Sequence, residues 1–330
     1  MKILEKFTFC VLAYNHSQYI IEHLESIKFQ VLNYGANIDC SIIINDDASK
    51  DDTVELIEKW FSKNDTIFKH ISKIYNKVNI GTCKAVINFS DNLKTRYFKI
   101  TAGDDVYSST NIFEFVSKND NHSIFSGIPL RLIDGVVSVS FFETFNYLAS
   151  DYIYENSNLI ERLSNVSIVN APNLFYSERD LKNPKIIEFL KQFDLVEDWS
   201  LQIAIAVNDK SSNIFSSNTN IVLYRRTCGS AYLIASSRVE KDNIKVFDYL
   251  IDYYKNSNKP LKVIMLKNRK YLYIKSNKYL KYLFDFQRFI YFFKLIWVFP
   301  IILKKYFSLR LNVKKEQLYY DKLRIQHDKS

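Results

Sequence analysis

Glycine, proline and cysteine are scarce in this 330-residue sequence, which contains six, five and four of them. So few glycines and prolines exclude long flexible linkers and proline-rich low-complexity stretches. The cysteines stand alone at Cys10, Cys40, Cys83 and Cys228, without the paired spacing of zinc sites or disulfide frameworks. Cys10 and Cys40 lie in apolar runs, so we expect them to be buried, reduced thiols.

The N-terminal segment MKILEKFTFCVLAYN lacks the uninterrupted apolar stretch of a secretory signal peptide, because Glu5 and Lys6 fall inside it. The segment runs directly into a strand-like apolar run. We therefore expect a cytoplasmic protein.

Negative charge is scarce near the C-terminus. Residues 260–330 hold 17 Lys and Arg against 4 Asp and Glu, whereas the rest of the chain is slightly acidic. The length and the 47% of hydrophobic residues suit one large or two modest domains. The contrast in charge favours two parts with different surroundings.

Apolar runs alternate with helical patterns through the first hundred residues. Strands are expected at 7–14, 40–45, 71–75 and 97–101, and helices at about 20–31, 52–63 and 83–93. This alternation predicts an α/β fold with a mostly parallel central sheet flanked by helices. The following part is less regular, with strand-like pieces at 123–127, 136–142 and 221–226 and helical patterns at 152–163 and 196–207.

Polar side chains follow each of the first four expected strands. They are Asn15 and His16, then Asp46 and Asp47, then Asn76 and Asn79, and finally Asp104 and Asp105 beside Gly103. Ligands of such sheets bind beyond the carboxyl ends of the strands, where these groups would gather. Carboxylate oxygens suit a hard divalent cation.

These groups also have structural interpretations. Aspartate is common in turns and helix caps, and acidic residues such as Glu197 and Asp198 are favoured at a helix N-terminus. His16 after a strand is more often a turn residue than a phosphate ligand, and Trp199 could pack in the core or stack on a ligand. A site is favoured because both aspartate pairs end strands of one alternating series.

Six segments together resemble family 2 glycosyltransferases of the GT-A fold. They are VLAYNHSQYI (11–20), IINDDASKDDT (43–53), NKVNIGTCKAVI (76–87), ITAGDDVY (100–107), VEDWSL (196–201) and LYRRTCGS (223–230). Their common order over about residues 7–230 is far more specific than any one motif. The resemblance implies an inverting transfer of a sugar from a nucleotide-diphosphate sugar, with UDP the expected nucleotide, in the assembly of bacterial cell-surface polysaccharide.

The resemblance also implies roles for individual residues. Ala13, Tyr14 and Asn15 would border the nucleotide, Asp46 or Asp47 would bond its base or ribose, Asn79 and Asp104 would lie nearby, and Arg225 or Arg226 would contact the diphosphate. Asp104 and Asp105 would bind Mn²⁺ or Mg²⁺, with Asp105 the better candidate for a direct ligand. Asp198 would take the proton of the acceptor, and Glu197 would shape the site.

The sequence departs from the family pattern at two places. Ala48 stands where a glycine usually follows the second aspartate pair, and Leu12 and Ala13 stand where Pro-Thr or a similar pair is usual. The QxxRW element of processive polysaccharide synthases is not evident, which favours a transferase of single or few steps.

The aromatic and basic tail predicts a surface helix. Residues 289–303 would form a helix of about 22 Å, shorter than the hydrocarbon core of a bilayer at about 30 Å. We therefore expect an interfacial helix on the inner face of the plasma membrane. Packing on the catalytic domain or on a second subunit is the alternative, and nucleic-acid binding is disfavoured because bulky aliphatic residues are so numerous.

We thus expect a GT-A catalytic domain at 1–235 and a basic helical region at 236–330. The expected partners are a nucleotide sugar, a glycan or lipid-linked acceptor, the membrane surface and, as one possibility, a second copy of the chain. A non-catalytic scaffold that binds sugar nucleotides or membranes is the main rival function. A nucleotidyltransferase is a weaker one, because YNHSQY lacks the glycine and basic residues that its first loop would need.

Overall fold

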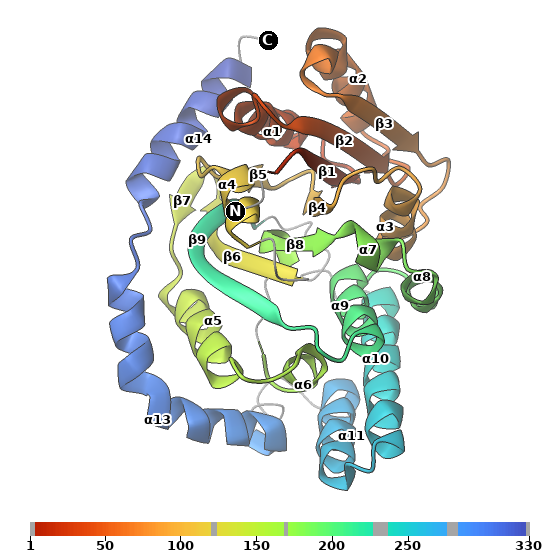
Figure 1. The fold of residues 1–330 in the computed structure, drawn as a ribbon, viewed down its shortest axis with the longest axis vertical. Helices are drawn as coiled ribbons and strands as arrows, with labels where there is room; N and C mark the ends of the chain where they lie inside the picture. The colour runs from red at the N-terminus through yellow and green to blue at the C-terminus, as the bar shows by residue number, and fades with distance from the viewer. Residues whose placement is uncertain (1–3, 120–123, 168–170, 227–236, 276–282, 328–330) are drawn as a thin grey trace.

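A computed structural model describes residues 4–119, 124–167, 171–226, 237–275 and 283–327 of the chain. Four parallel strands form one half of its sheet in the order β3-β2-β1-β4 (Figure 1). They are β1 (Lys6–Ala13), β2 (Asp39–Asp46), β3 (His70–Tyr75) and β4 (Tyr97–Ala102). Each begins and ends within one residue of its expected bounds, so the prediction of a parallel α/β sheet is confirmed.

Helices cover both faces of this half of the sheet. The connections are α1 (Ile20–Tyr34), α2 (Thr53–Asn64) and α3 (Thr82–Ser90). Phe7, Phe9 and Val11 of β1 are buried with apolar residues of α1 and α2, whereas Cys10 is buried with α3 on the other face. This alternation follows from the two-residue period of a strand. Cys10 and Cys40 are buried free thiols, as expected.

The second half of the sheet adds antiparallel pairings that the sequence did not predict, although three of its strands overlap the strand-like pieces expected at 123–127, 136–142 and 221–226. β8 (Leu174–Ser177) pairs antiparallel with β4 and with β6 (Ile124–Ile133), and β9 (Ile214–Arg225) runs parallel to β6. β5 (Val106–Tyr107) pairs with β9, and β7 (Val136–Ser138) pairs with β6. Within the described parts of the chain, these strands form one nine-stranded sheet.

Two expected elements of the middle region were wrong in their bounds. The helix expected at 152–163 is divided between α5 (Phe141–Ile153) and α6 (Leu159–Leu163), because the side chain of Asn158 accepts a hydrogen bond from Glu161 N and starts a new helix. The strand expected at 136–142 ends at Ser138, since Ser140 caps α5 by accepting from Glu143 N. The other helices here are α4 (Ile112–Lys118), α7 (Glu178–Leu181), α8 (Pro184–Leu190) and α9 (Glu197–Asn208).

The C-terminal helices wrap around the sheet and its helices (Figure 1). They are α10 (Ser237–Asn256), α11 (Pro260–Lys275), α13 (Phe286–Ser308) and α14 (Val313–His327). α10 shares the core of α9, α13 lies along α5, and α14 reaches α1 and β7. The expected boundary at residue 235 lies outside the described residues, and the division at this boundary stays a prediction.

The expected length of the tail helix was wrong. α13 has 23 residues and therefore extends about 34 Å, because Asp285 caps it by accepting from Gln287 N at 3.0 Å and the helix continues through Pro300. Within the described ranges it is the one helix whose length and mean hydropathy of 1.6 would suffice to cross a membrane. One of its faces nevertheless packs on α5, with Ile302 completely buried. That contact favours a helix lying along the protein surface.

Candidate active site

The loop after β1 is tied to the loop after β2. Asn15 has a φ of 53°, its backbone N donates to Ser49 Oγ at 2.8 Å, and its Oδ1 accepts from Lys50 N at 2.7 Å. Ala13, two residues earlier, is buried, whereas Tyr14 is 44% exposed. An exposed aromatic ring at the carboxyl edge of the sheet is available to a ligand.

The two aspartates after β2 are both engaged with backbone groups. Asp46 accepts from Ser49 N at 2.9 Å and from Ser49 Oγ. Asp47 accepts from Ile80 N at 2.7 Å and from Gly81 N at 2.9 Å, so it fixes the loop that follows β3. Asp47 therefore shapes the site by positioning this loop.

Ala48 occupies a strained backbone position between these loops. Its φ of 64° lies in the left-handed region, where a Cβ is unfavourable and glycine is not penalised. We expect Ala48→Gly to raise the free energy of unfolding by about 1 kcal/mol, as measured by urea denaturation. Ala85→Gly, within helix α3, is the matched control and should instead destabilise the protein.

The loop after β3 is closely packed against the start of α9. Gly81 has a φ of 85°, and a Cβ added there would lie 2.5 Å from the carbonyl oxygen of Asp194. Arg238, which the sequence analysis did not single out, holds Asp194 through its Nε and NH2 groups and donates to Asn79 Oδ1 at 3.1 Å. Asn79 thus lies at the expected edge, beside a guanidinium group.

Asp104 and Asp105 differ sharply in their surroundings. The Asp105 side chain is buried and accepts from Arg225 N at 3.0 Å, and burial, reinforced by the Asp104 charge, raises its pKa well above the usual range. The Asp104 carboxylate is partly exposed and has no hydrogen-bond partner among the described residues. The structure therefore presents Asp104 as the more accessible oxygen ligand, whereas the sequence analysis favoured Asp105.

Arg225 is committed to a buried network. Its Nε donates to the Asp104 carbonyl at 2.6 Å, its NH2 pairs with Glu22, and its guanidinium lies 4.5 Å from the centre of the Tyr19 ring. Tyr320 of α14 donates to the same Glu22 carboxylate at 2.8 Å. In this arrangement Arg225 holds the Asp104–Asp105 turn through hydrogen bonds to both residues.

Arg226 also has an acidic partner. It pairs with Glu143 of α5 at 2.8 Å, and the same carboxylate binds Arg131. Contact of either predicted arginine with a diphosphate stays a prediction, and it would require these pairs to rearrange. The remainder of the LYRRTCGS segment, residues 227–230, lies outside the described residues.

His16 lies closer to the acidic groups than its interpretation as a turn residue suggested. Its Nδ1 is buried without a hydrogen-bond partner in the described structure, and a Cβ added at Gly103 would lie 2.9 Å from it. Burial lowers the pKa of His16, while the charges of Asp104, Asp51 and Asp46 oppose that shift. A neutral imidazole beside two of the expected site aspartates is a polar group that a ligand can satisfy.

Glu197 and Asp198 are a half-buried acidic pair at the start of α9. Burial raises the pKa of Glu197 to about 7, the Asp198 charge adds to the rise, and a hydrogen bond with Thr82 opposes it. Burial likewise raises the pKa of Asp198. Thr82 also donates to the Leu195 carbonyl at 2.7 Å, which joins this pair to the loop after β3. Trp199 packs in the core against Phe247, as its structural interpretation held.

Contacts therefore link the loops after β1, β2 and β3 with the segment before α9. The β1 and β2 loops meet through Asn15, Asp47 holds the loop at Gly81, and that loop meets the start of α9. A half-buried carboxylate pair with raised pKa values is typical of proton transfer, and accessible oxygen ligands are typical of cation binding. The described residues therefore include candidate groups for both functions.

The donor set fits a divalent cation that is shared with a ligand. The described residues contain no cluster of three or more Asp, Glu, His or Cys that could enclose a metal. Mg²⁺ commonly takes only one or two carboxylates and completes its shell with phosphate oxygens and water. The Asp104 carboxylate, which has no hydrogen-bond partner among the described residues, and the neighbouring buried Asp105 match that pattern.

Comparisons with known proteins find similar sequences and similar folds. Residues 8–137 match the model of glycosyl transferase family 2, and no curated protein matches the chain significantly. The S. aureus TarS 1–349 structure in complex with UDP-GlcNAc has a TM-score of 0.54 at 13% identity, over 97% of this chain and 92% of that chain. A longer TarS structure gives 0.54 at 17% identity, over 83% of this chain but only 44% of that chain.

The mannosyltransferase PcManGT from Pyrobaculum calidifontis, in complex with GDP-Man and Mn²⁺, is also similar. Its TM-score is 0.51 at 12% identity, over 98% of this chain and 87% of that chain. At such identities the likeness shows the GT-A fold, and the sequence match adds the glycosyl transferase signature for residues 8–137.

Proposed function

We propose that this chain is a family 2 glycosyltransferase that moves a sugar from a nucleotide-diphosphate sugar, probed first as a UDP-sugar, to a glycan or lipid-linked acceptor in cell-surface polysaccharide assembly. Two observations support the proposal: the Asp104 carboxylate that follows β4 is accessible, and the half-buried pair Glu197 and Asp198 at the start of α9 has raised pKa values. The first group suits a cation and a diphosphate, and the second suits removal of a proton.

The proposed reaction is a single displacement with inversion at the anomeric carbon. Asp198 accepts the proton of the acceptor hydroxyl as that oxygen attacks, and the bond between the sugar and the diphosphate breaks. Mn²⁺ or Mg²⁺, when bound at Asp104 and Asp105, would neutralise charge on the departing diphosphate. Tyr14 and Asn15 border the nucleotide, and Asp47 keeps the loop near Asn79 in place.

Calorimetric titration of the full chain with UDP, GDP, dTDP and CMP tests the donor class. We expect one diphosphate to bind in the presence of Mn²⁺ and to lose at least tenfold in affinity with EDTA or in Asp104→Asn. Asp252→Asn is the control, since it removes one carboxylate from a surface ion pair on α10. If none of the four nucleotides binds, the result would instead favour a scaffold without catalytic activity.

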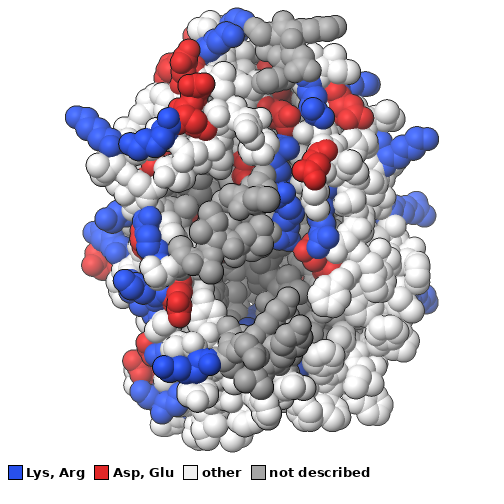
Figure 2. Space-filling model, turned by 180° about the vertical axis from the view of Figure 1, so that it is seen from behind, with Lys and Arg blue, Asp and Glu red and all other residues white. Residues whose placement is uncertain are grey.

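The exposed face of α13 supports the proposal of a peripheral membrane protein. The side chains of Trp297, Ile296 and Phe289 are 81%, 67% and 61% exposed, while the opposite face of the helix packs on α5. α13 lies at the lower left of Figure 1, and Figure 2 shows a broad uncharged area at the lower right of the reverse view. Lys304, Lys305 and neighbouring basic residues would face anionic headgroups.

We expect the full chain to float with anionic liposomes, and the variant with Ile296→Ser and Trp297→Ser to lose most of that binding. Leu32→Ser is the matched control, because it removes a 60% exposed side chain from α1, remote from α13. These variants are preferable to truncation near residue 259, which would remove Leu266 and Tyr320 from the folded core. Equal flotation of all three proteins would contradict membrane contact through α13.

A further inference from the structure

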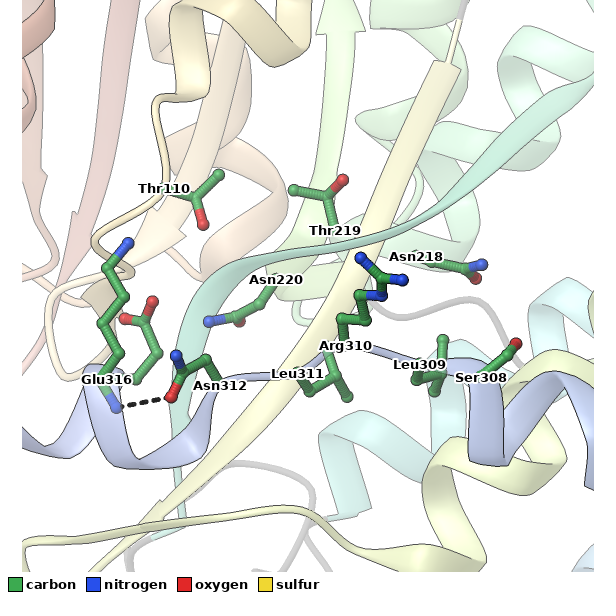
Figure 3. A pocket seen from close by; sticks show the side chains of 11 residues that line it. Thr110, Asn218, Thr219, Asn220, Ser308, Leu309, Arg310, Leu311, Asn312 and Glu316 are labelled. Atoms are coloured by element: carbon green, nitrogen blue, oxygen red, sulfur yellow. Dashed lines mark hydrogen bonds between the residues drawn. The ribbon is translucent and has the colours of Figure 1, made fainter.

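A polar cavity lies away from the candidate active site, between β9 and the connection of α13 to α14 (Figure 3). Its volume is about 440 Å³. β9 supplies Thr219 and Asn220 on one side, and residues 308–312 form the other side. Because Arg225 of the same strand adjoins Asp105, the cavity begins five residues, or about 17 Å, along β9 from the candidate metal site.

The side chain of Asn220 is the unusual feature of this cavity. It is only 7% exposed, yet neither its Nδ2 nor its Oδ1 has a hydrogen-bond partner in the described structure. In Figure 3 it points from β9 toward the α13–α14 connection. A buried amide without partners is unfavourable, so such a group in a cavity indicates that something polar binds there.

The other groups around the cavity favour an anion. Arg310 extends from the connection toward β9, Lys315 adds a second cation, and Thr110 and Thr219 add hydroxyl donors. The single carboxylate, Glu316, is already occupied, because its oxygens accept from Ser109 N at 2.9 Å and Ser109 Oγ at 2.8 Å. Neither cation has an ion-pair partner among the described residues.

The N-terminal end of α14 adds to this preference. Asn312 and Lys315 line the cavity at the start of the helix, where Asn312 Oδ1 accepts from Lys315 N at 3.0 Å. The partial positive charge of a helix N-terminus favours an anionic ligand. The described residues that line the cavity include no aromatic ring, so they offer no flat stacking surface of the kind that favours an uncharged sugar.

We propose that this cavity is a binding site for a phosphate ester, held by Arg310 and Lys315 with Asn220 Nδ2 and the threonine hydroxyls as donors. A guanidinium and an ammonium supply the charge, and the buried amide gains the partner it lacks. The phosphate could belong to a soluble phosphorylated polyol or to a lipid headgroup, because α13 ends at the cavity. The site is independent of the proposed glycosyl transfer.

The test uses the full chain and two probes, in EDTA. Glycerol 3-phosphate is titrated by calorimetry, with glycerol as the uncharged comparison. Vesicles of about 20% phosphatidic acid in phosphatidylcholine are tested by flotation. We expect saturable binding of one probe, at least tenfold weaker in Arg310→Gln and in Asn220→Val. Lys59→Gln is the control, since it removes the same charge from an exposed position on α2, outside the cavity and remote from α13.

Asn220→Val has a second readout. It removes the unpartnered amide from a strand, so the melting temperature of the ligand-free protein should stay unchanged or rise while phosphate binding is lost. Binding of glycerol 3-phosphate identifies a soluble ligand, and vesicle binding that Arg310→Gln and Asn220→Val both weaken identifies a lipid headgroup. The proposal is overturned if neither probe binds, if neither of these two variants weakens binding, or if Lys59→Gln weakens binding as much as Arg310→Gln does.

Discussion

Asp198→Asn should lower the turnover of sugar transfer by roughly a thousandfold while leaving nucleotide affinity within about twofold of the unaltered protein. The amide keeps the size of the side chain but cannot accept the proton of an acceptor hydroxyl. Asp198 stands at the start of α9, where its Oδ1 accepts from Trp199 N at 2.7 Å, so the change is local. Turnover and calorimetric affinity, measured on the same preparation, separate the loss of a base from a loss of folding.

Asp209→Asn is the matched control for this variant. Asp209 stands at the opposite end of α9, where it accepts from Ser211 in an exposed turn. Its substitution should leave turnover within about twofold of the unaltered protein, as is usual for a surface change. Full activity of Asp198→Asn would remove Asp198 from the mechanism and would favour the scaffold interpretation.

The same pair predicts how the rate depends on pH. Burial raises the pKa of Glu197 to about 7 and raises that of Asp198 as well. A base must be ionised to act, so the rate should fall as the pH drops below about 7 and the pair takes up a proton. Glu197→Gln removes the neighbouring negative charge, and the midpoint of the rate profile should then move to lower pH.

The parallel half of the fold could be predicted because its information is local. Each strand is a short apolar run, each helix has its own period, and the polar residues that end the strands identify the ligand edge. The antiparallel strands β8, β6 and β9 were harder, since their pairing depends on residues far apart in sequence, such as Phe98 with Tyr176. The folded structure is needed to show which of these strands pair.

The sequence predicts a set of candidate site residues but not the contacts they make. It places Asp47 and Asp104 at strand ends, yet only the structure shows that Asp47 binds backbone groups of the next loop while the Asp104 carboxylate has no partner among the described residues. For His16 a turn role was favoured over phosphate contact, because one histidine after a strand carries no pattern of its own. Only the structure shows that its Nδ1 is buried beside Gly103 without a hydrogen-bond partner among the described residues.

The C-terminal tail was predicted as an interfacial region, and its contact with the candidate site was not foreseen. A basic and aromatic composition gives no sign that Tyr320, far along the chain, would bond to Glu22 and lie 5.7 Å from the Arg225 guanidinium. The consequence is functional, because Arg225 also bonds to both aspartates of the candidate metal site. The final helix thus helps to hold that turn.

Arg225→Met should therefore destabilise the protein by about 3–5 kcal/mol, because it leaves the Glu22 carboxylate buried without its cation. The side chains of Arg225 and Glu22 are only 7% and 13% exposed, so water cannot replace the lost partner. Urea denaturation measures the free energy of unfolding. Arg324→Met is the matched control, since Arg324 approaches the same carboxylate only to 3.8 Å and is 54% exposed, and it should cost less than about 1 kcal/mol.

The double variant Glu22→Gln with Arg225→Met tests whether the lost energy comes from the unpaired charge. With both charges absent, no buried ion remains, so the double variant should be more stable than Arg225→Met alone. Sugar transfer should nevertheless stay low in the double variant, because methionine cannot donate to the Asp104 carbonyl as Arg225 Nε does. Recovery of both stability and activity would show that Arg225 only neutralises Glu22 and does not position the Asp104–Asp105 turn.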